Sequence, residues 1–201
     1  MFTLIASMIT FAFVGAVTPG PVNLVATSTG ARAGWNAAMP HVLGASLGYT
    51  LVVICAGAGM SLASQLLPTF ADAMRYLGGL FLLYMAFKIA TAPVDNEVTD
   101  SSANRAKSGL FSGALIQILN PKAWIVSLSG ISLYVTSQPE LGYYLGLFIA
   151  VSFICCFAGV SCWALAGHLI GQRLSRPALR RRFNQLMALL LAVAVILMLL
   201  E

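Results

Sequence analysis

Long apolar runs separated by short polar segments dominate this sequence. The runs are solid rather than alternating, which favours membrane-spanning helices over the strands of a membrane barrel. A bilayer core about 30 Å thick needs about 20 helical residues, so several runs are long enough to cross it. The pattern predicts an all-α polytopic membrane protein with six transmembrane helices, at about 3–30, 37–62, 68–91, 108–134, 141–168 and 182–200.

The composition supports a membrane protein. Hydrophobic residues make up 59% of the chain and charged residues only 8%, against about 25% charged in an ordinary soluble domain. The N-terminus lacks the basic segment and small-residue cleavage site of a signal peptide, so it is expected to form a mature first helix. Asp72 and Arg75 are expected at the mouth of the third span.

Basic residues are distributed unevenly between the two sides of these six spans. Only Arg75 falls in a loop on one side, and Lys122 lies within the fourth span. Because basic loops stay in the cytoplasm, the first, third and fifth loops are predicted to be cytoplasmic and both termini periplasmic. The net charge of +5 then reflects topology and attraction to anionic lipid rather than binding to nucleic acid. Nine residues lie on the basic side: Arg32, Lys88, Arg105, Lys107, Arg173, Arg176, Arg180, Arg181 and Arg182.

A polar linker, TAPVDNEVTDSSANRAKSG, divides the chain into halves of three spans each. The whole chain, 1–201, is predicted to be one transmembrane transporter domain: a first repeat at about 1–91, the linker at about 92–107 and a second repeat at about 108–201. Because three is odd, two such repeats must have inverted topology. An offset of 102 residues aligns Pro19 with Pro121.

Prolines interrupt the first and fourth predicted spans, in TPGP (18–21) and ILNPKAW (118–124). A mid-span proline frees a carbonyl group, and unwound backbone at membrane depth is tolerated where it lines a cavity or is buried in protein. Each break also creates a half-helix whose N-terminus carries partial positive charge. Packing kinks are the alternative, but matched breaks in two inverted halves are typical of the binding site of a secondary transporter.

Several segments resemble the LysE/RhtB family of amino-acid exporters over nearly the whole chain. They include TPGPVNLV, GASLGYTLVVICAGAG, YLGGLFLLYMAFKIA and ILNPKAW, while SCWALAGHLIGQRL with AFKIATAP is similar to the cysteine/O-acetylserine exporter branch. The resemblance implies export of small amino acids from the bacterial cytoplasm across the inner membrane, driven by an ion gradient. One departure is that predicted spans 2 and 5 lack an acidic residue, and position 49 is Tyr. The usual carboxylate for proton coupling is therefore missing.

Lys122 is expected to bind the carboxylate of the substrate, because no acidic residue lies in the interior of any predicted span. Its alternative is to extend toward the interface along its aliphatic stem. His41 is the candidate for proton coupling, and hydration near the interface is the alternative explanation. The asparagines beside the breaks are candidates to bind the substrate or to bond freed carbonyl groups. The predicted substrate-binding set is Pro19, Gly20, Pro21, Asn23, Asn120, Pro121 and Lys122.

Other functions and partners find less support in the sequence. Its four cysteines, Cys55, Cys155, Cys156 and Cys162, contain no C-x-x-C pair, so no metal, cofactor or enzymatic activity is predicted. A thiol-relay oxidoreductase and a non-transporting assembly factor are the alternative functions. Five G-x-x-x-G spacings favour close helix packing within the chain as readily as a homodimer.

Overall fold

The computed structural model describes residues 2–59, 63–92, 102–174 and 176–200. All regular secondary structure in these ranges is α-helical, which confirms the all-α part of the predicted fold class. Eight helices follow one another along this part of the chain: α1 (Phe2–Val17), α2 (Pro21–Ala33), α3 (Trp35–Ala58), α4 (Ala63–Ala90), α5 (Ser102–Ile118), α6 (Pro121–Tyr134), α7 (Leu141–Arg173) and α8 (Pro177–Leu200).

The six predicted spans correspond to helices or to pairs of helices. Among the described residues, α3 and α7 are each long and apolar enough to cross a membrane. The pairs α1–α2 and α5–α6 qualify as two further spans if each bent pair is counted as one, with bends of 62° and 61°. Two to four candidate spans are therefore supported by length and composition, and the spans at α4 and α8 stay predictions.

Both predicted breaks occur, but the first is not organised around the expected proline. α2 begins at Pro21 and α6 begins at Pro121, each proline being the first helical residue. Proline is favoured there because its ring presets the helical φ angle and the missing N–H would have no intrahelical partner. Pro19 lies in the connection between α1 and α2. The structural counterpart of Pro121 is thus Pro21 rather than Pro19. The offset that aligned Pro121 with Pro19 is two residues too long.

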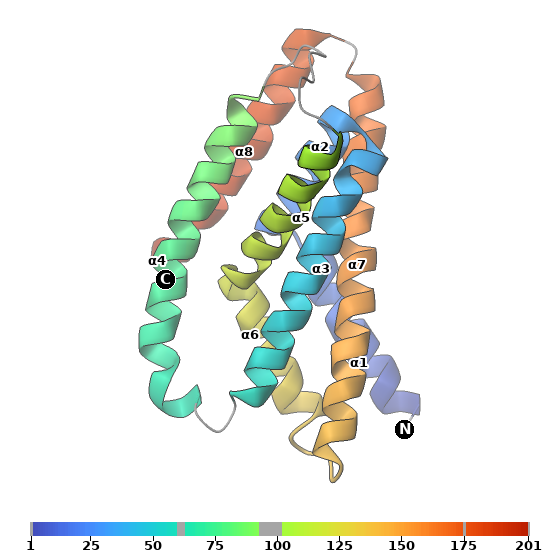
Figure 1. The fold of residues 1–201 in the computed structure, drawn as a ribbon, viewed down its shortest axis with the longest axis vertical. Helices are drawn as coiled ribbons and strands as arrows, with labels where there is room; N and C mark the ends of the chain where they lie inside the picture. The colour runs from blue at the N-terminus through green and yellow to red at the C-terminus, as the bar shows by residue number, and fades with distance from the viewer. Residues whose placement is uncertain (1, 60–62, 93–101, 175, 201) are drawn as a thin grey trace.

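The helix ends that carry the basic residues gather at one end of the molecule. In Figure 1, α2, α4 and α7 finish at the upper end, where α3, α5 and α8 begin. The opposite end holds the N-terminus of α1, the junction of α3 with α4 and that of α6 with α7. Arg32, Lys88 and Arg173 lie in the last turns of α2, α4 and α7. The arrangement therefore places these three basic helix ends on a common side.

Glycines allow α3 and α5 to approach until their backbones touch. A Cβ atom on Gly44 would fall on the carbonyl oxygen of Leu110, and one on Gly113 would fall on that of His41. Small residues at such positions are the usual means of close packing between membrane helices. This contact fixes α5, and with it the second break, against the middle of the bundle.

A similar contact holds α2 against α7. A Cβ atom on Gly30 would fall on the carbonyl oxygen of Ala164, and Gly167 is equally confined by α2. The G-x-x-x-G spacings in α2, α3, α5 and α7 therefore serve packing within the chain. By contrast, Gly142 and Gly146 have no atom within 4 Å of an added Cβ in the described structure.

Candidate substrate site between the helix breaks

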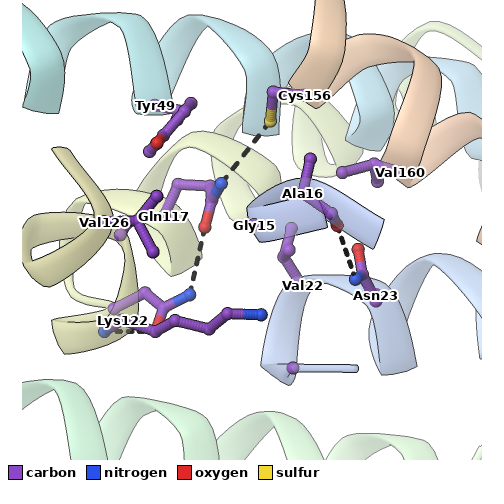
Figure 2. A pocket seen from close by; sticks show the side chains of 13 residues that line it. Gly15, Ala16, Val22, Asn23, Tyr49, Gln117, Lys122, Val126, Cys156 and Val160 are labelled. Atoms are coloured by element: carbon purple, nitrogen blue, oxygen red, sulfur yellow. Dashed lines mark hydrogen bonds between the residues drawn. The ribbon is translucent and has the colours of Figure 1, made fainter. Parts of the chain in front are cut away.

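A small cavity with a polar and apolar lining lies between the two breaks. Residues from α1, α2, α3, α5, α6 and α7 line it (Figure 2). Of the predicted set, Gly20, Asn23, Asn120 and Lys122 line this cavity, whereas the three prolines do not. Its volume is about 30 Å³, whereas one water molecule needs roughly 10–15 Å³. The cavity can therefore hold water, and it is partly open to its surroundings.

Asn23 bonds the carbonyl groups released by the first break. Its Nδ2 donates to Ala16 O and to Thr18 O, both at 3.0 Å. Trp163 of α7 supplies a further donor, from Nε1 to Val17 O at 2.9 Å. Freed carbonyl groups need such donors because no water reaches them in a membrane core. The amide nitrogen of Asn23 therefore bonds freed carbonyl groups, which is one of the two roles predicted for this residue.

The amide oxygen of Asn23 is available to another partner. Asn23 is 1% exposed, and its Oδ1 has no hydrogen-bond partner in the described structure. A buried acceptor without a donor is costly. A group with N–H donors that enters the cavity would remove this cost, and a substrate ammonium is one such group.

Lys122 reaches across the cavity to the first break. Its Nζ donates to Thr18 O at 2.8 Å, so the ammonium binds a carbonyl group released 104 residues earlier in the chain. Lys122 is half-buried and turns into the bundle rather than outward (Figure 2).

The N-termini of α2 and α6 are satisfied differently. At α6, the Oδ1 of Asn120 accepts from the backbone N–H of Lys122 at 3.2 Å. At α2, the preceding residue is Gly20, which offers no side-chain cap. A Cβ atom on Gly20 would lie 3.6 Å from Lys122 Nζ, so an ammonium group stands beside the uncapped helix end. Partial and full positive charge therefore meet at the start of α2, which suits a carboxylate.

Gln117 and Cys156 extend this network to α7. The Nδ2 of Asn120 donates to Gln117 Oε1 at 3.1 Å, and Gln117 Nε2 donates to Cys156 Sγ at 3.6 Å (Figure 2). Both residues and Tyr49 line the cavity, and none was predicted from the sequence. The only sequence signal for Gln117 is its polar side chain, four residues before the proline of the second break.

His41 is buried next to the site rather than hydrated near an interface. It is 2% exposed, which overturns the interpretation that water satisfies its ring. Its Nε2 lies 3.2 Å from Val22 O in the first turn of α2, and its Nδ1 has no partner in the described part of the chain. A carbonyl oxygen can only accept, so Nε2 carries the proton and Nδ1 is a free acceptor. His168, by contrast, is partly exposed and lies 3.1 Å from Gln172 Nε2.

The described residues contain no cluster of three or more histidine, cysteine or acidic side chains that would hold a metal ion. Cys155 and Cys156 are buried, while Cys55 and Cys162 are exposed on the helix surfaces.

Two bent helix pairs whose breaks face a cavity, within a bundle of apolar helices, are typical of a multi-pass membrane transport protein. A family model described as "LysE type translocator" matches residues 13–201. The chain belongs to this family.

Curated relatives are similar in sequence to this chain over almost their full length. The chain is 32% identical over 195 residues to a cysteine/O-acetylserine efflux protein of Salmonella typhimurium, covering 96% of each chain. It is 32% identical over 197 residues to the protein of that name from Escherichia coli K12, again with 96% coverage of each. No solved structure matches the chain.

Proposed function

We propose that the protein is a secondary transporter that exports small neutral amino acids or their derivatives across the bacterial inner membrane. The observation that carries this proposal is the meeting of Lys122 with the uncapped N-terminus of α2, beside the unpartnered oxygen of Asn23. A free amino acid carries one carboxylate and one ammonium, and the site offers a complementary group to each. The efflux relatives make cysteine and O-acetylserine the first substrates to examine.

Substrate binding would replace hydrogen bonds that are present in the described structure. The substrate carboxylate would take the place of Thr18 O at Lys122 Nζ, and the substrate ammonium would donate to Asn23 Oδ1. Because Thr18 O keeps its bond from Asn23 Nδ2 at 3.0 Å, it is not left without a donor. The ammonium of Lys122 would then bond an ionised acceptor in place of a neutral one, so the exchange favours the occupied site.

The test of this function is export from cells preloaded with labelled amino acids. Cells that contain the protein should lose labelled cysteine or O-acetylserine faster than cells with an inactive variant. The transporter itself should not need ATP for this export. An oxidoreductase or an assembly factor would not change efflux in reconstituted vesicles. Absence of efflux for every amino acid in a broad panel would contradict the proposal.

We further propose six spans in two inverted halves, with both termini in the periplasm. The common end for Arg32, Lys88 and Arg173 supports this topology, since basic helix ends remain cytoplasmic. A reporter fused after Thr91 should be active only in the cytoplasm, and one fused after Glu201 only in the periplasm. Activity of both fusions in one compartment would show that the number of spans between them is even.

His41 is proposed to couple proton movement to export. The free Nδ1 can accept a proton, and the ring is bonded through Nε2 to the first turn of α2, one residue before Asn23. The contacts that the structure gives His41 are to Val22 and to the backbone near Gly109 and Gly113, none of which titrates. Charge on the ring would therefore act directly on the helix end that binds the substrate.

His41→Gln should separate coupling from binding. A glutamine amide can still donate to Val22 O but takes up no proton. Accumulation of substrate driven by a pH gradient should fall at least tenfold, roughly the loss expected on removing a general proton carrier, while substrate exchange without a gradient continues. His168→Gln is the matched control and should accumulate substrate like the parent. Gradient-driven export by His41→Gln at the parental rate would place the coupling group elsewhere.

A further inference from the structure

Gln117 donates a hydrogen bond to an acceptor that is much weaker than an oxygen atom. Its carboxamide nitrogen has two N–H donors, and the acceptor that the described structure gives it is the thiol of Cys156 at 3.6 Å. Sulfur is a weak acceptor. Gln117 is 6% exposed and lines the cavity, so water does not compensate freely for the weak bond.

The other side of the carboxamide is held in place. Oε1 of Gln117 accepts from Asn120 at 3.1 Å, and Asn120 in turn caps α6. This bond fixes which edge of the carboxamide faces Asn120 and which edge faces α7. The N–H groups are therefore oriented toward Cys156 and the adjoining cavity wall, as Figure 2 shows for the labelled side chains.

The groups assigned to the carboxylate and ammonium of the substrate meet at the first break, although Lys122 itself belongs to α6. Lys122 Nζ and Asn23 Nδ2 both bond Thr18 O, beside the start of α2. Gln117, Cys156 and Tyr49 come from α5, α7 and α3. An amino acid whose backbone groups bind near Thr18 would direct its side chain toward these three residues.

We propose that Gln117 is a specificity-determining residue: its N–H groups bind an oxygen acceptor on the side chain of the exported amino acid, displacing the thiol of Cys156. This inference rests on the proposed function and adds the class of side chain to it. Short side chains that carry a hydroxyl or ester carbonyl are preferred, because an oxygen accepts more strongly than the thiol that it replaces. An apolar side chain of the same length gains no such bond.

Competition between O-acetylserine and norleucine in reconstituted vesicles tests the inference. The side chains have the same length, but norleucine lacks oxygen. The parent should favour O-acetylserine about tenfold, the worth of one added hydrogen bond. Gln117→Leu should bring this ratio close to one, whereas Cys156→Ala should keep or increase it because Gln117 is retained. Ser152→Ala is a control: Ser152 is buried on α7, does not line the cavity, and should keep the parental ratio.

Gln117→Leu also removes an acceptor from Asn120, so its abundance in the membrane must be measured. If this variant does not accumulate, Gln117→Asn retains a carboxamide one methylene shorter, and it should lower the ratio by several fold. An unchanged ratio in the folded Gln117 variant, or loss of the preference in Cys156→Ala, would overturn the role of Gln117. Absence of any amino-acid export by the parent would instead contradict the proposed function.

Discussion

Lys122→Gln is expected to weaken binding of free amino acids by about 10- to 150-fold, the equivalent of the roughly 1.5–3 kcal/mol of a hydrogen bond to a charged group. Glutamine retains N–H donors that reach toward Thr18 O, but it removes the charge at the start of α2. The variant should therefore fold like the parent without substrate, and the loss should appear in its affinity for the substrate. The measurement is the concentration dependence of substrate exchange in reconstituted vesicles, normalised to the amount of folded protein.

A substrate analogue makes this prediction specific for the carboxylate. The parent should prefer an amino acid over the corresponding amino-acid amide, and Lys122→Gln should lose most of this preference. Lys122→Arg should recover it only in part, since a planar guanidinium and a compact ammonium place their donors differently.

Lys88→Gln is the matched control for the loss of a lysine charge. Lys88 is exposed in the last turn of α4, with Nζ 5.6 Å from the centre of the Tyr84 ring. This variant should bind substrate like the parent. Parental affinity and parental discrimination in Lys122→Gln would show that Lys122 only bonds the Thr18 carbonyl.

Gly44→Ala should strongly reduce the amount of folded protein. The added Cβ would fall on the carbonyl oxygen of Leu110, and backbone cannot move aside without separating α3 from α5. The cost is at least that of an overpacked core, about 1–3 kcal/mol, despite the higher helix propensity of alanine. Thermal unfolding of the purified protein and its abundance in membranes measure the effect.

Gly142→Ala provides the same chemical change at a glycine with open space around it. An added Cβ there meets no atom within 4 Å in the described structure, so the variant should be as stable as the parent or slightly more stable. Reduced stability of Gly142→Ala comparable to that of Gly44→Ala would imply that Gly142 is packed against a partner, such as a second copy of the chain. Equal stability of both variants would contradict the close contact of α3 with α5.

The difference between the two helix ends suggests why one chain needs two breaks. At α6, Asn120 satisfies the helix end and connects it to Gln117. At α2, Gly20 leaves the helix end open, and Lys122 from the second break lies beside it. The second break thus holds Lys122 and the Gln117 carboxamide in place, and the first break provides the open helix end beside Lys122. Movement of α2 relative to α6 would directly change the site that we propose for the substrate carboxylate.

The sequence by itself determined the helical membrane class and the two interruptions. These features are local: an apolar run needs no partner to be recognised, and a proline lacks its N–H wherever it stands. The sequence also predicted that Asn23, Asn120 and Lys122 belong to one site, because the breaks and a buried charge each require polar partners. It did not predict which proline begins α2, since TPGP offers Pro19 and Pro21 two residues apart.

Only the tertiary structure decided the partners. Lys122 bonds a carbonyl group 104 residues away, and Gln117 bonds a thiol 39 residues away. His41 is buried because α2 and α5 cover it, although its position in the sequence is near the start of a helix. Helix packing sets these contacts, and in this bundle it depends on the backbone approach that Gly30, Gly44 and other glycines allow. Local sequence gives each polar group a need for a partner, whereas the packed helices determine which group meets it.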